Sequence, residues 1–138
     1  MFGFRHWRTL HILVSQSEGR PFDGLEHEDS PYNAIGDAGL SKKDQLQKFG
    51  WPLLAHEQSH SWDGKYRRPG ELYSKPDYQG PERTSLLWVY EGLNQYIGML
   101  LATRAVLHLD GVIDVLDADL VDRELPRVGM TLHVLHGR

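Results

Sequence analysis

Two histidines and a glutamate stand close together in the stretch "WPLLAHEQSHSWDGK", where residues 56–60 read HEQSH. On a helix, His56 and His60 are four residues apart and project from the same face, one turn from each other. Two imidazoles placed in this way can bind one metal ion. Glu57 lies about 100° further round the helix, where its carboxylate can reach a water at the metal without binding the metal. The spacing therefore predicts a metal centre with a carboxylate base, although a motif this short also arises by chance.

The chemistry expected of such a centre is metal-assisted hydrolysis of a peptide bond. Zinc acidifies a water and polarises the scissile carbonyl, and Glu57 takes the proton of the water and passes it to the leaving amine. A catalytic zinc ion has three protein ligands and one open position. The chain contains no cysteine, so the third ligand should be His, Asp or Glu. Glu91 is the best candidate, because it lies within the apolar and aromatic stretch "LLWVYEGL", where an unpaired charge is costly to bury.

The length and composition indicate a single, slightly acidic domain. A chain of 138 residues with 40% apolar residues can bury one modest core, and its net charge of −4 does not indicate nucleic-acid binding. No apolar run is long enough to span a membrane, and the N-terminal stretch "MFGFRHWRTLHILVS" lacks the features of a secretion signal. The compartment therefore stays open between a cytoplasm and a periplasm.

The first third of the chain is expected to form strands and a loop. The stretch "HWRTLHILVSQ" is rich in β-branched and aromatic residues, which predicts a strand over about residues 6–15. A short second strand is expected within "FDGLEHEDS". The stretch "SPYNAIGDAGLS" contains Pro31, Gly36 and Gly39, and this composition favours a loop.

The middle of the chain is expected to be helical. A short helix is predicted over about residues 42–48, and Gly50 is expected to interrupt it. Pro52 suits the first turn of a new helix that carries the HEQSH motif and ends before Gly64. Three prolines and three glycines predict an irregular connection over residues 64–83, where Lys65, Arg67 and Arg68 are expected to be solvated.

A long amphipathic helix is predicted over residues 84–108, with Thr84 at its N-terminus. Its apolar positions follow the i, i+3, i+4, i+7 pattern, at 86, 89, 90, 93, 96, 97, 100 and 101. An acidic helix is a weaker prediction over residues 110–124, and the last dozen residues give no clear pattern.

Four segments stand in order along the chain: "DGLEHEDS" at 23–30, "HEQSHSWD" at 56–63, "KYRRPGEL" at 65–72 and "PDYQGPERTSLLWVYEGLNQYIG" at 76–98. Their order and spacing resemble those of the glycyl aminopeptidase family of thermolysin-like zinc peptidases, the gluzincins. That family shows "GGLEH", "HEYFHSWN", "KR.RP", "DY" and "LLWVAEGFT.YYG" segments. The resemblance covers about residues 20–105, and several ordered motifs are far more specific than one short motif.

The resemblance implies a zinc-dependent aminopeptidase with a preference for small N-terminal residues such as Gly or Ala. It makes His56, His60 and Glu91 the zinc ligands and Glu57 the general base. Glu26 takes the position of a glutamate that holds the free amine of the substrate in related aminopeptidases. A half-exposed strand carboxylate without a role in binding is an equally simple interpretation of Glu26.

The fold class implied is α+β, a thermolysin-like catalytic core. Short antiparallel edge strands would pack on the helix with the HEQSH motif and on a second helix with the glutamate ligand. The chain would form one partial gluzincin catalytic domain over residues 1–138. Its expected parts are a strand region 1–30, the first helix region 41–63, a connection 64–83, the glutamate helix 84–108 and an acidic C-terminal segment 109–138.

Two departures from the family pattern support an alternative. Gln58 and Ser59 replace an aromatic pair between the histidines, and members of the family are several times longer than this chain. In addition, no tyrosine follows Tyr96 to stabilise an oxyanion. The remaining downstream candidates for that role are His108, His133 and His136. The alternative is a non-catalytic, metal-binding fragment or a degenerate peptidase domain that lacks the oxyanion donor.

The expected partners are a peptide substrate and a second copy of the chain, which would pair through exposed strand edges such as that of residues 6–15. No nucleic-acid or membrane partner is expected. Asp63 and Asn94 could orient a ligand imidazole, although a helix cap or a surface group is the simpler interpretation of both.

Overall fold

The structure is a computed structural model that describes residues 3–19, 22–36, 39–73, 79–81, 83–108, 124–125 and 130–136. Its strands form one sheet in the order β2-β3-β1-β5-β4. The strands are β1 (Leu10–Gln16), β2 (Asp23–Leu25), β3 (Tyr32–Ile35), β4 (Glu124–Leu125) and β5 (Met130–His136). Strand β1 runs parallel to β3 and β5, whereas β2 pairs antiparallel with β3 and β4 pairs antiparallel with β5. The sheet is therefore mixed and not purely antiparallel.

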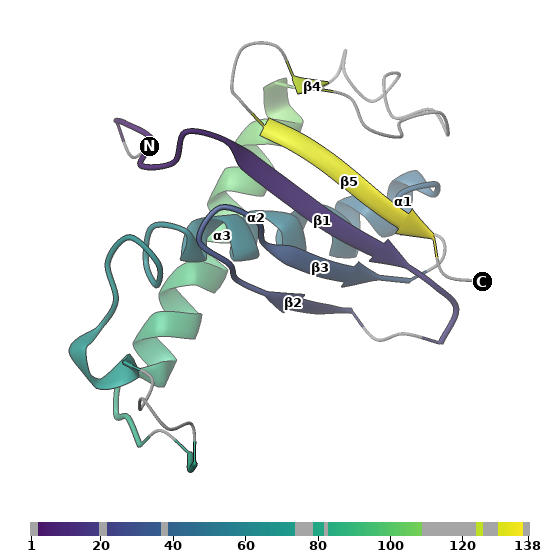
Figure 1. Cartoon of the computed structure of the whole chain (residues 1–138). Helices are drawn as coiled ribbons and strands as arrows, with labels where there is room; N and C mark the ends of the chain where they lie inside the picture. Colours follow the sequence, from purple (N-terminus) through teal and green to yellow (C-terminus); the bar gives the residue numbers. More distant parts are fainter. Residues whose placement is uncertain are drawn as a thin grey trace.

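The helices form a second layer behind this sheet (Figure 1). They are α1 (Lys43–Gln45), the π-helix η1 (Leu46–Gly50), α2 (Trp51–His60), the 3-10 helix η2 (Gly70–Leu72) and α3 (Leu87–His108). Helix α2 packs against β2 and β3, and α3 packs along α2. The fold is thus α+β, as predicted, with α2 between the sheet and α3.

Strand β1 lies inside the sheet and not at its edge. It pairs with β3 on one side and with β5 on the other. Leu10 and Val14 are completely buried, which explains the apolar, β-branched composition of this stretch. The prediction of a strand here is confirmed with bounds shifted to Leu10–Gln16, but the prediction of an open edge at residues 6–15 is wrong.

Strand β3 corrects the prediction of a loop over "SPYNAIGDAGLS". Residues 33–35 of this strand are buried, because β1 and β2 flank it and the helix layer covers it. The apolar run is only a few residues long and lies between Pro31 and Gly36. A short buried strand between turn-forming residues has a composition typical of a loop, so pattern analysis does not detect it.

The helical segment that leads to the HEQSH motif is continuous through Gly50. This glycine has the helical angles φ −65° and ψ −58°, and η1 passes directly into α2. The predicted interruption is therefore wrong. A Cβ at residue 50 would lie 2.9 Å from Leu46 Cδ1, so glycine here permits close packing and does not end the helix.

Helix α3 confirms the predicted helix with a slightly later start. The predicted apolar face is only partly buried, because Leu93 and Tyr96 are exposed whereas Asn94 is buried. The amide of Leu86 donates to Thr84 Oγ1 at 2.9 Å, and the Ser85 amide donates to Glu71 Oε2 at 2.9 Å. These contacts satisfy donors at the start of the helix. The predicted acidic helix at 110–124 falls almost entirely outside the described residues, while β5 forms within the C-terminal stretch that showed no pattern. The domain bounds stay a prediction.

Across the part of the chain that the structure describes, no helix is long and apolar enough to cross a membrane.

Candidate metal centre

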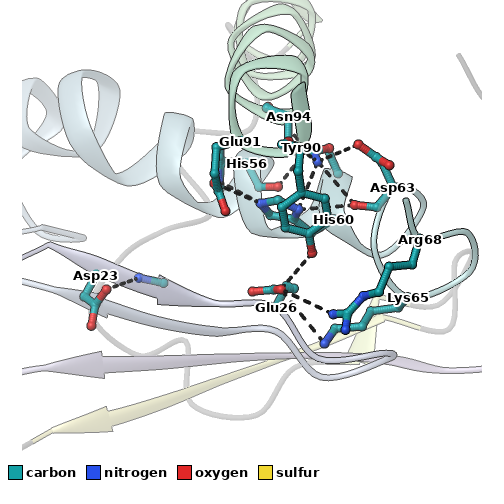
Figure 2. Close-up of polar contacts among 12 residues, drawn as sticks. Asp23, Glu26, His56, His60, Asp63, Lys65, Arg68, Tyr90, Glu91 and Asn94 are labelled. Atoms are coloured by element: carbon teal, nitrogen blue, oxygen red, sulfur yellow. Dashed lines mark hydrogen bonds and ion pairs between the residues drawn. The ribbon is translucent and has the colours of Figure 1, made fainter. Parts of the chain in front are cut away.

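Three side chains from two helices converge on one point. His56 and His60 come from α2, and Glu91 comes from the second turn of α3 (Figure 2). His56 Nε2 lies 3.0 Å from His60 Nε2. Glu91 Oε2 lies 3.3 Å from His56 Nε2 and 3.4 Å from His60 Nε2. The ligand atoms therefore form a nearly equilateral triangle of three electron-pair donors.

The triangle fits a small divalent metal ion. Ligand atoms at about 2.0–2.1 Å from a tetrahedral zinc ion lie about 3.3–3.4 Å from each other. The observed edges of 3.0, 3.3 and 3.4 Å are close to this value. Among the residues described, this is also the group of His, Asp and Glu side chains that could hold a metal ion. The donor set contains two imidazoles and a carboxylate, which suits zinc.

His60 is fixed by hydrogen bonds on the side of its ring away from Glu91. It is 1% exposed. Its Nδ1 lies 3.2 Å from the carbonyl oxygen of Asp63 and 2.9 Å from Asn94 Nδ2. Donation of the Nδ1 proton to the Asp63 carbonyl leaves Nε2 unprotonated and directed at the triangle. In this tautomer Asn94 Nδ2 is a second donor beside Nδ1 and forms no hydrogen bond with it, so Asn94 acts on His60 through Asp63, to whose carbonyl it donates at 3.2 Å. The setting of His60 therefore favours the tautomer that a metal ligand needs.

Asn94 is an interior residue and not a surface group. It is completely buried on α3, and its Nδ2 donates to the carbonyl of Tyr90 at 2.8 Å and to Asp63 Oδ2 at 3.1 Å. It therefore connects α3 with the end of α2 beside His60. The simpler interpretation of this residue from the sequence is wrong, because the sequence shows neither its burial nor its partner.

We expect Asn94→Ala to weaken zinc binding by about 10–100-fold, the usual effect of losing a group that orients a ligand imidazole. Isothermal titration of the metal-free protein with zinc measures the change. Thr103→Ala is a matched control, because Thr103 lies on the same helix and is exposed, with a hydrogen bond to its own helix at Met99. Equal zinc affinity in wild type and Asn94→Ala would contradict the orienting role.

His56 is held mainly by packing. Its Nδ1 is buried and has no hydrogen-bond partner among the described residues. A Cβ at Gly98 of α3 would lie 2.8 Å from His56 N and Cα, so α3 packs directly on the backbone of α2 at this point. Burial lowers the pKa of His56, as does the neighbouring His60, although Glu91 opposes the shift. The imidazole is thus favoured in its neutral, metal-binding form.

Glu57 lies beside the triangle with its side chain 5% exposed. Burial raises its pKa to about 8, and the carboxylates of Glu26, Glu91 and Asp23 add to the shift. A carboxylate with a raised pKa can accept and return a proton near neutral pH. Glu57 also lines a cavity of about 470 Å³ together with His56 and Glu91, so Glu57 and two of the triangle residues face one space.

The raised pKa of Glu57 predicts a pH-dependent stability of the metal-free chain. Between pH 4.5 and about 8 the folded chain keeps a proton on Glu57 that the unfolded chain has released. The free energy of unfolding should therefore fall as the pH rises through this window. Glu57→Gln, which has no proton to release, should show a shallower fall. Urea unfolding at about pH 5 and about pH 8 tests this, and equal falls for both proteins would contradict it.

Glu26 occupies a polar cluster next to His60. Tyr90 Oη donates to Glu26 Oε1 at 2.7 Å, and Lys65 Nζ and Arg68 Nη2 lie 4.0 and 3.9 Å from the same oxygen (Figure 2). Burial alone raises the pKa of Glu26, but the Tyr90 hydrogen bond and the nearby positive charges bring it below its usual value. Glu26 is thus a partly buried, ionised carboxylate, and Lys65 and Arg68 are not simply solvated.

Tyr90 is a residue of this site that the sequence analysis did not identify. Its ring lies over the ring of His60, with centroids 4.3 Å apart, and its hydroxyl reaches Glu26. One signal was present in the sequence: Tyr90 stands directly before Glu91, where the family pattern shows alanine.

The downstream histidines lie away from this centre. His133 and His136 belong to β5, which β1 and β3 separate from β2, and three strand spacings amount to about 14 Å. His108 ends α3, 17 positions after Glu91, which corresponds to about 25 Å along the helix. The backbone of β5 is thus three strands from β2, and the backbone of residue 108 lies at the far end of α3 from Glu91.

A family model described as M61 glycyl aminopeptidase matches residues 51–129, which is more than half of the chain. The chain belongs to the M61 glycyl aminopeptidase family. Searches of curated proteins and of solved structures gave no match. The M61 match includes α2 and α3, and hence His56, Glu57, His60 and Glu91, whereas Glu26 precedes it. The resemblance inferred from the ordered motifs is confirmed, and the chain is a member of a peptidase family.

Proposed function

We propose that this M61 protein is a zinc-dependent aminopeptidase with a thermolysin-like core. The observation that carries the proposal is the convergence of His56 Nε2, His60 Nε2 and Glu91 Oε2 within 3.0–3.4 Å of each other. These three residues would hold the zinc ion. When bound, zinc acidifies a water molecule and polarises the scissile carbonyl.

Glu57 supplies the proton transfer. Its carboxylate takes a proton from the attacking water and delivers it to the nitrogen of the leaving amine. Its raised pKa, about 8 in the metal-free chain, lets it hold the proton near neutral pH, and a cation bound nearby would favour the carboxylate form that accepts the proton. The Asp63 carbonyl accepts from His60 Nδ1 and Asn94 holds Asp63, so together they keep His60 in place while the substrate binds.

Glu26 is proposed to bind the free amine of the substrate. Its pKa lies below the usual value, so the carboxylate is charged, and an ammonium group is its natural partner. The hydroxyl of Tyr90 occupies Oε1 and fixes the carboxylate, which leaves Oε2 for the substrate. Lys65 and Arg68 reduce the negative charge at this position, so affinity for the amine depends on this hydrogen-bonded geometry as well as on charge.

The experiment that tests the function compares glycine- or alanine-headed peptides with their N-acetylated forms. Chelator-sensitive cleavage of the free peptides, with strong preference over the acetylated ones, is the result expected. Glu26→Ala should remove the preference, and Glu18→Ala, an exposed carboxylate elsewhere, should retain it. Zinc binding without cleavage of either peptide would instead support a non-catalytic metal-binding domain.

Self-association is also expected, through α3 and not through β1. Trp88, Tyr96 and Met99 share one face of the helix and are 76%, 66% and 47% exposed. A contiguous apolar face of this kind tends to become an interface. Light scattering should show an oligomer that Trp88→Lys returns to monomer. A wild-type monomer at about 0.1 mM protein would contradict this expectation, since such a concentration populates even weak dimers.

A further inference from the structure

Strand β2 and the residue directly after it present two residues to the helix layer. Gly24 and Glu26 are two positions apart and point to the same face of the sheet. Their neighbours Asp23 and Leu25 are exposed. Glu26 uses this face to meet Tyr90 of α3. Gly24 uses it to meet Glu57 of α2, so this short stretch lies against the proposed general base and itself supplies Glu26, the second carboxylate that the proposed mechanism requires.

Gly24 and Glu57 approach so closely that no side chain fits between them. A Cβ at residue 24 would lie 2.6 Å from Glu57 Cγ and closer still to its Cδ and Oε1. These three atoms, Cγ, Cδ and Oε1, make up most of the Glu57 side chain beyond Cβ. The φ angle of Gly24 is not in the left-handed region, so the backbone itself does not require glycine here. The three atoms nearest to such a Cβ all belong to Glu57.

We propose that Gly24 is a positioning residue for Glu57, because the missing side chain at residue 24 forms the slot that holds the carboxylate. The strand covers one side of the Glu57 side chain, and the cavity of about 470 Å³ lies beside it. An alanine at residue 24 would force the Glu57 carboxylate toward that cavity or force β2 away from α2. The catalytic consequence rests on the proposed role of Glu57 as the base, but the steric contact does not.

A double-mutant cycle in the whole chain tests the contact directly. Gly24→Ala should lower the melting temperature of the metal-free protein by about 3–10 °C, the effect of overpacking one methyl group in a tight site. In a Glu57→Ala background the same change should have almost no effect or slightly raise the melting temperature, because the clash is gone and alanine restricts the unfolded chain. Gly70→Ala, with open space around residue 70, should have the same small effect in both backgrounds.

The outcomes of the cycle are distinct. If Gly24→Ala alone fails to fold, folding of Gly24→Ala/Glu57→Ala still supports the proposal. An equal loss of stability in both backgrounds, or a double variant that also fails to fold, would overturn it, because the cost would then come from another neighbour. Zinc stoichiometry should stay that of wild type in Gly24→Ala, since the three ligand residues do not touch Gly24.

Steady-state kinetics distinguish a positioning role of Gly24 from a purely structural one, because a purely structural role would leave kcat unchanged. Gly24→Ala should lower kcat by about 10–100-fold with KM within about threefold of wild type, because a displacement of about 1 Å of a catalytic group has this effect. Unchanged kcat would overturn the positioning role. If wild type itself shows no peptidase activity, the proposed function fails, while the stability cycle still decides whether Gly24 holds Glu57.

Discussion

Glu57→Gln is expected to lower kcat for a glycine-headed peptide by at least about a hundredfold, while the bound zinc stays unchanged. An amide has nearly the same shape as the carboxylate but cannot accept the proton of the attacking water. Glu57 does not belong to the triangle of His56, His60 and Glu91, so the metal site should keep its geometry. Steady-state kinetics and metal analysis on the same preparation measure both quantities.

Gln95→Ala is the matched control for this experiment. Gln95 lines the same cavity as Glu57, is exposed, and has no place in the proposed chemistry. We expect its kcat to stay within about threefold of wild type, well below the effect of losing a general base. A Glu57→Gln variant that retains kcat within the same limits would show that another group takes the proton.

Glu91→Ala is expected to remove most of the zinc affinity and with it the peptidase activity. The carboxylate of Glu91 is one corner of the triangle. Because its side chain is half-exposed, the substitution should remove little packing energy from the folded chain. The loss in zinc affinity should exceed the roughly 10–100-fold effect of losing a hydrogen-bonding partner of a ligand. Zinc titration of the metal-free proteins provides the comparison, again with Gln95→Ala, one turn along the same helix, as the control.

The circular dichroism spectrum of Glu91→Ala should match that of metal-free wild type, which separates metal loss from unfolding. Zinc affinity within about tenfold of wild type would exclude Glu91 as a ligand, because it would equal the effect of an indirect contact at most. His56 and His60 would then need a third ligand from elsewhere.

The sequence predicted the parts of this site that depend on local geometry. The spacing of His56 and His60 determines their shared face on any helix, and the structure provides that helix. The apolar period of residues 86–101 predicted α3, and with it the element that carries Glu91. The convergence of Glu91 with the histidines required the ordered resemblance as well, because no local pattern relates α2 to α3.

The features that sequence analysis missed are tertiary. Strand β3 is short and lies between turn-forming residues, and its burial depends on neighbours that are distant in sequence. Asn94 is polar on an apolar helix, and only the packing of α3 against the end of α2 shows its contact with His60. The role of Gly24 was missed for the same reason, because a glycine in a strand does not reveal which side chain fills the space beside it.

The most direct measurement of the central claim is a crystal structure of the zinc-soaked protein, with anomalous diffraction data recorded on both sides of the zinc absorption edge. The account predicts one strong anomalous peak about 2.0–2.2 Å from His56 Nε2, His60 Nε2 and an oxygen of Glu91. It also predicts that Glu57 stays outside bonding distance of the peak. A zinc peak bound to other residues, or Glu91 directed away from both imidazoles, would contradict the proposed metal centre.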